Sequence, residues 1–241
     1  MNLLQTIECL SELYGLRNAM FFRGDARAML LHRGVRSLNY AIRKERPVEE
    51  VTVMLASAFA RSVAFADSFV DLPIVFSLCK KYPETGCAYC ENIPCECELN
   101  RGKHIKISSV SEGQMSWTIS EWIDHMDRVY GEVNKKRGIS TALLRLIEEM
   151  HEVESAHLFD DMSDSSIGLS VRRENVALEL ADLFAWIFSI AAMLKLPLQK
   201  TIYERYCGFC KRCTKRPCDC GSPMYYSKRA NPKNTSNTSY I

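Results

Sequence analysis

The sequence lacks an apolar run long enough to cross a bilayer. Its longest nearly uninterrupted apolar stretch, Leu183 to Leu194, is flanked by charged residues and is shorter than the about 20 residues of a membrane-spanning helix. The first residues, Met1 to Gly15, show neither a basic segment nor the small-residue cleavage site of an export signal. We therefore expect a protein that does not span a membrane and that has a cytoplasmic location.

A large net charge is also absent. The 241 residues include 31 Lys and Arg against 29 Asp and Glu, a formal charge of +2, so a nucleic acid is not the expected partner. With 47% hydrophobic and 25% charged residues, the composition excludes wholesale disorder, a collagen-like chain and a coiled-coil rod. The length suits one large domain or two small ones.

Cysteine, by contrast, is abundant. Eight of the eleven cysteines form two copies of the pattern C-x-x-C-x4-C-x-C, each with a proline before the third cysteine: Cys87, Cys90, Cys95 and Cys97, then Cys210, Cys213, Cys218 and Cys220. Four thiolates on a short loop are typical of a structural zinc site. The alternatives are iron at these sites, or reduced or disulfide-paired surface cysteines. The isolated Cys9 and Cys79 are expected to be small buried hydrophobes.

The sequences that precede the cysteines repeat as well. Leu13-Tyr14-Gly15-x-x-Asn18 aligns with Val129-Tyr130-Gly131-x-x-Asn134, and Leu72-Pro73 aligns with Leu196-Pro197. These matches divide the chain into a first repeat of residues 1–97 and a second repeat of residues 115–220. Between them, the polar residues 98–114 predict a linker with one extended segment at 104–107, and residues 221–241 predict a disordered tail.

Helical signals dominate both repeats. In the second repeat, Thr118 and Glu121 form a capping box that opens a helix to about Tyr130, where Gly131 permits a break. Apolar spacing then predicts helices over residues 140–158, 171–195 and 198–206. The first repeat follows the same plan, with helices over residues 4–14, 26–43, 47–70 and 74–81. The predicted fold class is all-α, with two tandem helical bundles, each followed by a four-cysteine loop.

Two acid pairs stand on the long helices of the second repeat. Glu149 and Glu152 form an E-x-x-E pair, and Glu179 and Asp182 form an E-x-x-D pair. This spacing puts both carboxylates of a pair on one helix face, and the apolar surroundings of the second pair predict burial. Buried acids need a cation from another helix or a hard divalent metal. The alternative is that Glu148, Glu149 and Glu152 are solvated surface acids and that Asp182 caps a helix or pairs with an arginine such as Arg145.

Together, the two pairs resemble the motif of the MazG-like, all-α nucleoside triphosphate pyrophosphohydrolases. The resemblance covers about Thr118 to Pro197 and includes the Tyr130-Gly131 helix end and the Glu-Leu-Ala-Asp-Leu-Phe-Ala-Trp run from Glu179. It implies that Glu149, Glu152, Glu179 and Asp182 hold Mg²⁺ and that water attacks the α-phosphorus of a (d)NTP, releasing (d)NMP and pyrophosphate. Such an enzyme would clean the nucleotide pool.

With this function, the chemistry of neighbouring residues indicates further roles. The predicted catalytic residues are Glu148, Glu149 and Glu152, with either Glu148 or Glu149 taking the proton from water. The predicted substrate contacts are Asn134, Lys135, Lys136 and Arg137, which follow the first helix of the repeat and for which a solvated basic turn is the alternative. Trp122 is predicted to stack on the base, whereas Trp186 is expected to have a core role.

The first repeat departs from this motif, because His32, Arg33 and Arg36 occupy the positions of Glu148, Glu149 and Glu152. We therefore expect a pseudo-dimer with a degenerate first repeat that covers the site of the second. A homodimer of such pseudo-dimers is a further possibility.

A different class of function is a zinc-binding nucleic-acid or protein interaction module on a catalytically inactive bundle. Four cations beside the second cysteine group, Lys211, Arg212, Lys215 and Arg216, favour this interpretation. The nearly neutral charge and the retention of all four acids in one repeat oppose it. A thiol redox function ranks third, because no βαβ pattern accompanies the Cys-x-x-Cys pairs.

Overall fold

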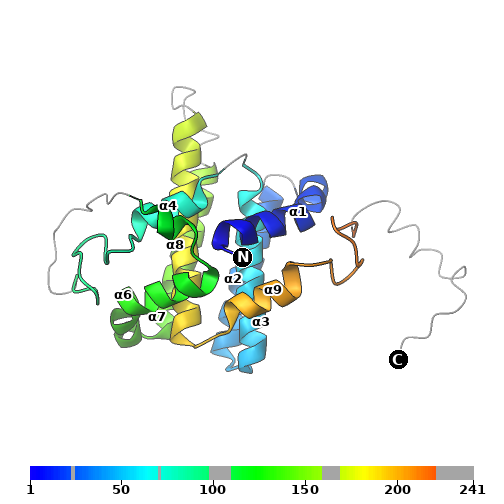
Figure 1. Ribbon diagram of the computed structural model, residues 1–241. Helices are drawn as coiled ribbons and strands as arrows, with labels where there is room; N and C mark the ends of the chain where they lie inside the picture. The colour runs from blue at the N-terminus through cyan, green and yellow to red at the C-terminus, as the bar shows by residue number, and fades with distance from the viewer. Residues whose placement is uncertain (23–24, 70–71, 98–109, 159–168, 221–241) are drawn as a thin grey trace, which may run out of the picture.

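The computed structural model describes residues 1–22, 25–69, 72–97, 110–158 and 169–220 (Figure 1). Within these ranges the chain forms helices and no strand, which confirms the predicted all-α class. The helices are α1 (Leu3–Phe21), α2 (Asp25–Arg43), α3 (Val48–Ala66), α4 (Ile74–Lys81), α5 (Glu112–Met115), α6 (Ile119–Arg137), α7 (Ile139–Leu158), α8 (Leu169–Met193) and α9 (Leu198–Tyr206). The predicted extended segment at 104–107 and the predicted disordered tail lie outside the described residues.

Equivalent capping boxes start the first helix of each repeat. The Asn2 side chain accepts from the Gln5 backbone N–H at α1, and the Thr118 side chain accepts from the Glu121 N–H at α6. Each box satisfies backbone donors that have no partner inside the helix. The predicted helix starts therefore hold in both repeats.

The predicted break at Gly131 is wrong, because α6 continues to Arg137. A Cβ atom at Gly131 would lie 2.4 Å from Asp127 Oδ1. The glycine thus makes room for a side chain one turn earlier and does not end the helix. In the same way α1 continues past Gly15 to Phe21, beyond the predicted end at residue 14.

A single continuous apolar core joins the two repeats. At its centre α3 packs against α8, and the ring centroids of Phe59 and Phe184 lie 5.0 Å apart. Both side chains are 0% exposed, and burying one phenylalanine contributes about 1.5–3 kcal/mol. The pairing of the repeats is therefore part of the hydrophobic core.

Helix α8 is mostly apolar, although it carries three acidic residues. Its segment Arg173–Met193 has the length and the mean hydropathy of a membrane span. The apolar part of this helix is therefore longer than the stretch Leu183–Leu194 that stands out in the sequence. In the fold, 67% of the 18-residue apolar window in this segment is buried inside the protein, and the helix packs against α3, α4, α6 and α7. Burial of most of its faces explains why it is apolar nearly all round.

The last helix of each repeat packs on the other repeat. In Figure 1, α4 lies against α8, whereas α9 lies against α3 and α1 and also contacts α6 of its own repeat. Matching edge-to-face tyrosine pairs mark the two contacts: Tyr82 and Tyr130 have ring centroids 6.0 Å apart, and Tyr206 and Tyr14 have centroids 6.3 Å apart. The exchange brings the end of the first repeat to the acid-bearing helices of the second.

Candidate functional site

Three of the four predicted metal ligands converge. Carboxylate oxygens of Glu149 on α7 and of Glu179 and Asp182 on α8 lie within 4.8 Å of one another. One Glu149 oxygen, Oε1, accepts a hydrogen bond from Trp186 Nε1 at 3.3 Å. The other, Oε2, is buried and has no hydrogen-bond partner among the described residues. We call these three residues the acidic cluster.

The acidic cluster is short of positive charge. Burial, together with the charges of Asp182 and Glu152, raises the pKa of Glu149 to about 7. Burial also raises the pKa of Glu179, and the lowering effect of Lys81 is opposed by Asp182 and Glu152. Each group thus holds its proton more tightly than a solvated carboxylic acid does. A divalent cation would remove this repulsion and would give the buried Glu149 oxygen a partner, so the residues fit a hard metal ion.

Of the two other predicted acids, Glu152 lies at the edge of the acidic cluster and Glu148 lies outside it. Glu152 is solvent-exposed and neighbours Glu179, whose pKa it helps to raise. Glu148 accepts from Arg145 Nη1 at 2.5 Å, with both side chains about half exposed. The structure therefore brings Glu152 to the cluster but leaves Glu148 on the surface, and Arg145 pairs with Glu148 instead of with Asp182.

The partner of Asp182 comes from the first repeat. The Lys81 ammonium forms an ion pair with Asp182 Oδ2 and donates to the Leu178 carbonyl at 3.4 Å. Tyr82 Oη donates to Asp182 Oδ1 at 2.7 Å. Sequence reasoning missed both residues. The signal that could have identified them is the repetition of a basic residue followed by tyrosine at the end of α9, Arg205-Tyr206.

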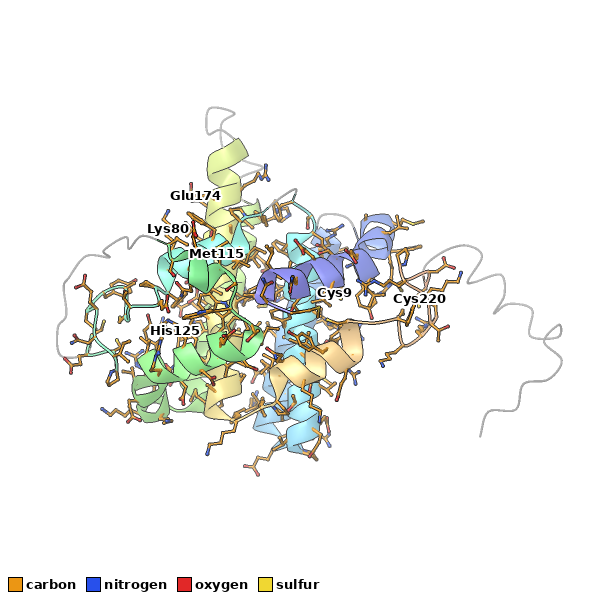
Figure 2. All side chains as sticks on the ribbon, in the orientation of Figure 1. Cys9, Lys80, Met115, His125, Glu174 and Cys220 are labelled. Carbon is orange, nitrogen blue, oxygen red and sulfur yellow. The ribbon has the colours of Figure 1, made fainter. Side chains whose placement is uncertain are left out.

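A cavity of about 700 Å³ opens beside the acidic cluster. Four cationic side chains line it, namely Lys80, Lys81, Arg137 and Arg145, together with four aromatic ones, namely Tyr82, Tyr89, Tyr130 and Trp186. Lys80 also forms an ion pair with Glu174 at 3.2 Å on the same side of the molecule, as Figure 2 shows. The cavity thus combines acids, cations and rings, although Trp186 was expected to have a core role.

The predicted substrate contacts divide into two groups. Asn134 and Arg137 line the cavity. Lys135 forms ion pairs with Asp127 and Glu132, each at 3.7 Å, and Lys136 is exposed. Neither lysine is among the residues that line the cavity.

The stacking role predicted for Trp122 does not fit this structure. Its side chain is 0% exposed, and its ring packs against Trp117 with the centroids 5.0 Å apart. The ring of His125 lies 6.0 Å from it on the same helix. A ring that is covered in the core presents no face to a nucleobase, whereas Trp186, Tyr89 and Tyr130 lie on the cavity wall.

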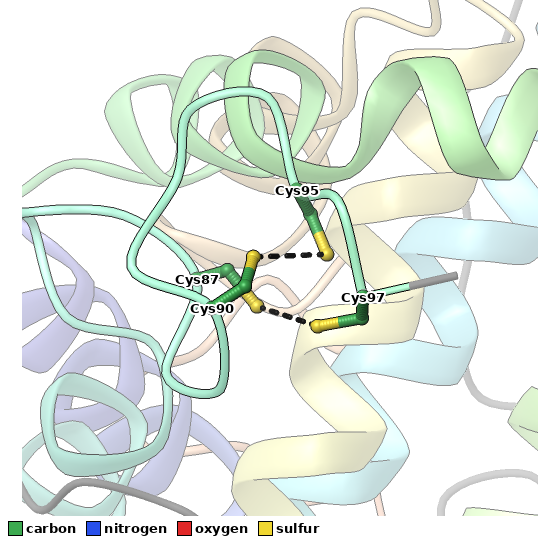
Figure 3. A group of neighbouring side chains, drawn as sticks. All are labelled: Cys87, Cys90, Cys95 and Cys97. Atoms are coloured by element: carbon green, nitrogen blue, oxygen red, sulfur yellow. Dashed lines mark hydrogen bonds between the residues drawn. The ribbon is translucent and has the colours of Figure 1, made fainter. Parts of the chain in front are cut away.

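The first cysteine group forms one wall of the same cavity. Figure 3 shows the side chains of Cys87, Cys90, Cys95 and Cys97 pointing toward a common centre. The sulfur atoms of Cys87 and Cys97 are 3.5 Å apart, and those of Cys90 and Cys95 are 3.9 Å apart. A zinc ion bound to four sulfurs at 2.3 Å would place them about 3.8 Å apart. The group therefore could hold a zinc ion, as predicted.

The second cysteine group has the same geometry. The Cys210 sulfur lies 3.6 Å from that of Cys220 and 3.4 Å from that of Cys218, and the sulfurs of Cys213 and Cys218 are 3.9 Å apart. In each group a backbone N–H reaches the second cysteine sulfur, from Glu96 to Cys90 at 3.3 Å and from Asp219 to Cys213 at 3.4 Å. Burial by itself would raise the pKa of Cys90, but the hydrogen bonds from the Glu96 and Asn92 backbone lower it to about 7. Such bonds favour the thiolate that binds metal. Cys9 and Cys79 are buried, as expected.

Each cysteine loop is attached to the first helix of the opposite repeat. The Cys95 N–H donates to the Val129 carbonyl on α6, and the Cys218 N–H donates to the Leu13 carbonyl on α1, both at 2.7 Å. Val129 and Leu13 are equivalent in the sequence repeat. Only the first loop therefore lies at the acid-bearing repeat, and Figure 2 shows Cys220 on the side of the molecule away from Lys80.

The cations of the second loop are partly neutralised within the chain. Lys215 pairs with Asp219 at 2.7 Å, and Arg216 pairs with Glu12 on α1 at 2.5 Å. These ion pairs weaken the basic character on which the interaction-module interpretation depends.

Comparison of the chain with protein-family models, with curated protein sequences and with solved structures gives no match.

Proposed function

We propose that the protein is a Mg²⁺-dependent nucleoside triphosphate pyrophosphohydrolase of the MazG-like type, built as a tandem pseudo-dimer with one site. The observation that supports the proposal is the convergence of Glu149, Glu179 and Asp182 beside a cavity of about 700 Å³ with cationic side chains. Pockets of about 300–1,000 Å³ are typical of sites for ligands of nucleotide size. Acids and cations at one site suit a metal-bound phosphate chain better than either charge alone.

The acidic cluster would hold the Mg²⁺, with Glu152 as a neighbouring carboxylate. When bound, the ion would neutralise phosphate oxygens and lower the pKa of water. The fit depends on the buried, unpartnered Glu149 Oε2 and on the oxygen-only ligand set, which a hard cation prefers.

The protein's own residues would position the substrate. Lys81, Arg137 and Arg145 line the cavity and supply positive charge for the triphosphate. Of the two glutamates considered for proton transfer, Glu149 faces the cavity, whereas Glu148 is bound by Arg145. Glu149 is therefore the better candidate to accept the proton of the attacking water.

The first cysteine loop would form the base-side wall. Its residues Cys87, Ala88 and Tyr89 line the cavity, and Tyr130 on α6 lines it as well. A zinc ion in this loop would fix its backbone, since a loop this short has almost no core of its own. The zinc would therefore have a structural role, separate from the reaction.

The test is incubation of the protein with a panel of NTPs and dNTPs plus Mg²⁺, with pyrophosphate and phosphate release measured separately. Pyrophosphate and monophosphate are the expected products, and Asp182→Asn and Glu179→Gln should lower kcat by at least about 100-fold. Glu174→Gln is the matched control, because it removes an exposed carboxylate from the same helix. It should leave turnover within about twofold.

One observation favours a second candidate, the zinc-binding interaction module. Lys81 already supplies Asp182 with a cation from within the chain. If a folded, zinc-loaded protein neither binds Mg²⁺ nor turns over any nucleotide of the panel, the acidic cluster is a structural ion-pair network and the second candidate replaces the first.

A further inference from the structure

A second group of potential metal ligands lies where α2 meets α7. His32 Nε2 is 2.5 Å from Glu154 Oε1, and His151 Nδ1 is 3.5 Å from Glu154 Oε2. Donor atoms of all three side chains lie within 4.8 Å of one another. None of the three lines the cavity or belongs to the acidic cluster.

The helices bring these side chains together in a defined way. His151 and Glu154 are three residues apart on α7, so they share one face of the helix. His32 reaches that face from α2, and the two imidazole rings lie 5.4 Å apart at their centroids with an angle of 65° between their planes. The ring nitrogens therefore approach the carboxylate from different directions, as ligands around a metal ion do.

The donor set selects the kind of cation. Two imidazole nitrogens and one carboxylate oxygen suit Zn²⁺ and the neighbouring transition metals, whereas Mg²⁺ prefers oxygen ligands alone. Nitrogen and oxygen ligands at about 2.1 Å from a tetrahedral zinc ion lie about 3.4 Å apart. The observed separations of 2.5 and 3.5 Å bracket that value, so small side-chain rotations would create the site.

We propose that His32, His151 and Glu154 form a transition-metal site, with Zn²⁺ as its preferred occupant and a fourth position open to solvent. Glu154 is the inner ligand, since its side chain is 13% exposed, while those of His32 and His151 are 43% and 59% exposed. The outward-facing imidazoles leave room for a water molecule, as in zinc sites with three protein ligands.

A cation at this site would link the two repeats directly. His32 belongs to the first repeat and the other two ligands belong to the second, so the ion would bridge α2 and α7 at the edge of their contact. His32 also stands where the sequence repeat has Glu148. This departure of the first repeat therefore supplies a ligand in place of an acid.

The proposal is tested by zinc stoichiometry on the full-length, untagged protein. Titration with Zn²⁺ is followed by dialysis and metal analysis, with excess Mg²⁺ present throughout so that the acidic cluster is not counted. The wild type should retain one more Zn²⁺ per chain than His32→Ala, His151→Ala or Glu154→Gln. Zn²⁺ should also raise the melting temperature of the wild type more than that of these variants.

His157→Gln is the matched control, because it removes another α7 histidine whose ring packs against Phe65 and Phe69. It should retain the same number of zinc ions as the wild type. Circular dichroism of each variant separates loss of a ligand from loss of folding, and Glu154→Gln provides a variant of unchanged shape. Equal zinc content in the wild type and the folded ligand variants would overturn the proposal. The cysteine sites are unchanged in every variant, so their occupancy does not affect the difference.

Discussion

Tyr82 Oη donates to Asp182 Oδ1 at 2.7 Å, although the two residues belong to different sequence repeats. Together with the ion pair from Lys81, this bond fixes the orientation of a carboxylate in the acidic cluster. The site of the second repeat is therefore completed by residues of the first.

Tyr82→Phe should destabilise the protein. The change leaves Asp182 Oδ1 without a buried donor, and hydrogen bonds to charged groups contribute about 1.5–3 kcal/mol. Urea unfolding should show a loss in this range. Tyr206→Phe is the control. When Pro73 is aligned with Pro197, the position of Asp182 is occupied in the first repeat by Ala58, so the loss in this variant should stay below about 0.5 kcal/mol. Equal losses in both variants would contradict the role given to Tyr82.

Lys81→Ala should tighten Mg²⁺ binding in the absence of nucleotide. Lys81 competes with the metal for Asp182, and a partly buried ion pair of about 1 kcal/mol corresponds to a fivefold change in Kd. Calorimetric titration with MgCl₂ gives the comparison. Lys80→Ala removes a neighbouring cation that pairs with Glu174 outside the cluster, and it should leave the Kd unchanged. Weaker binding in Lys81→Ala would show that the lysine supports the metal site.

Stabilisation by Mg²⁺ should increase with pH. The pKa of Glu149 rises from 4.5 to about 7 on folding, so its contribution to stability is complete below 4.5 and is lost as the pH rises through 7. A bound cation would cancel the repulsion that appears above that pH. The melting temperature measured with and without Mg²⁺ should thus differ more at about pH 8 than at about pH 5.5. Glu149→Gln should reduce this pH dependence; a wild-type shift that is the same at both pH values would argue against metal at the cluster.

The two cysteine groups should differ in their effect on turnover. Cys90→Ser and Cys213→Ser each remove one sulfur ligand, and each should lower the zinc content by about one ion per chain. Only the first loop lines the cavity, so Cys90→Ser should lower kcat/KM by at least about 10-fold, whereas Cys213→Ser should remain within about twofold below its unfolding temperature. Metal analysis and pyrophosphate release measure the two quantities, and similar activity losses would count against a wall formed by the first loop.

Cleavage between the repeats should not separate them. A specific protease site introduced among residues 98–109 would divide the chain between α4 and α5. Because α4 packs on α8 and α9 packs on α3, the two pieces should elute together in gel filtration and should separate only in denaturant. Elution as two native fragments would contradict the exchange of the last helices.

Much of the fold could be predicted from local signals. The bounds of α4 and α9 follow from a proline before each helix and from apolar spacing, and the acid pairs follow from helix periodicity. The two four-cysteine groups are identified by spacing alone, and the structure brings their sulfur atoms together.

The partners of the acids could not be predicted in this way. The apolar face of α4 is the same whether the helix packs on its own repeat or on the other one, so no local pattern reveals the exchange. Lys81 and Tyr82 were missed for this reason. Trp122, which was expected to stack on a base, lies in the core, and Trp186, which was expected in the core, lies at the cavity wall. A tryptophan in a helix has the same sequence signature at a cavity wall as in a core.

The exchanged helix α4 has a consequence for synthesis of the chain. Its apolar residues Ile74, Val75 and Leu78 are buried in the finished protein, and the contact from Lys81 to Asp182 spans 101 residues. Ribosomes add about 5–20 residues per second, so α4 leaves the exit tunnel on the order of 5–20 s before its partner α8 does. The first repeat in turn lacks α9 until residues 198–206 have been added. Both halves of the nascent polypeptide thus expose apolar surface until late in translation, and neither can complete its packing first.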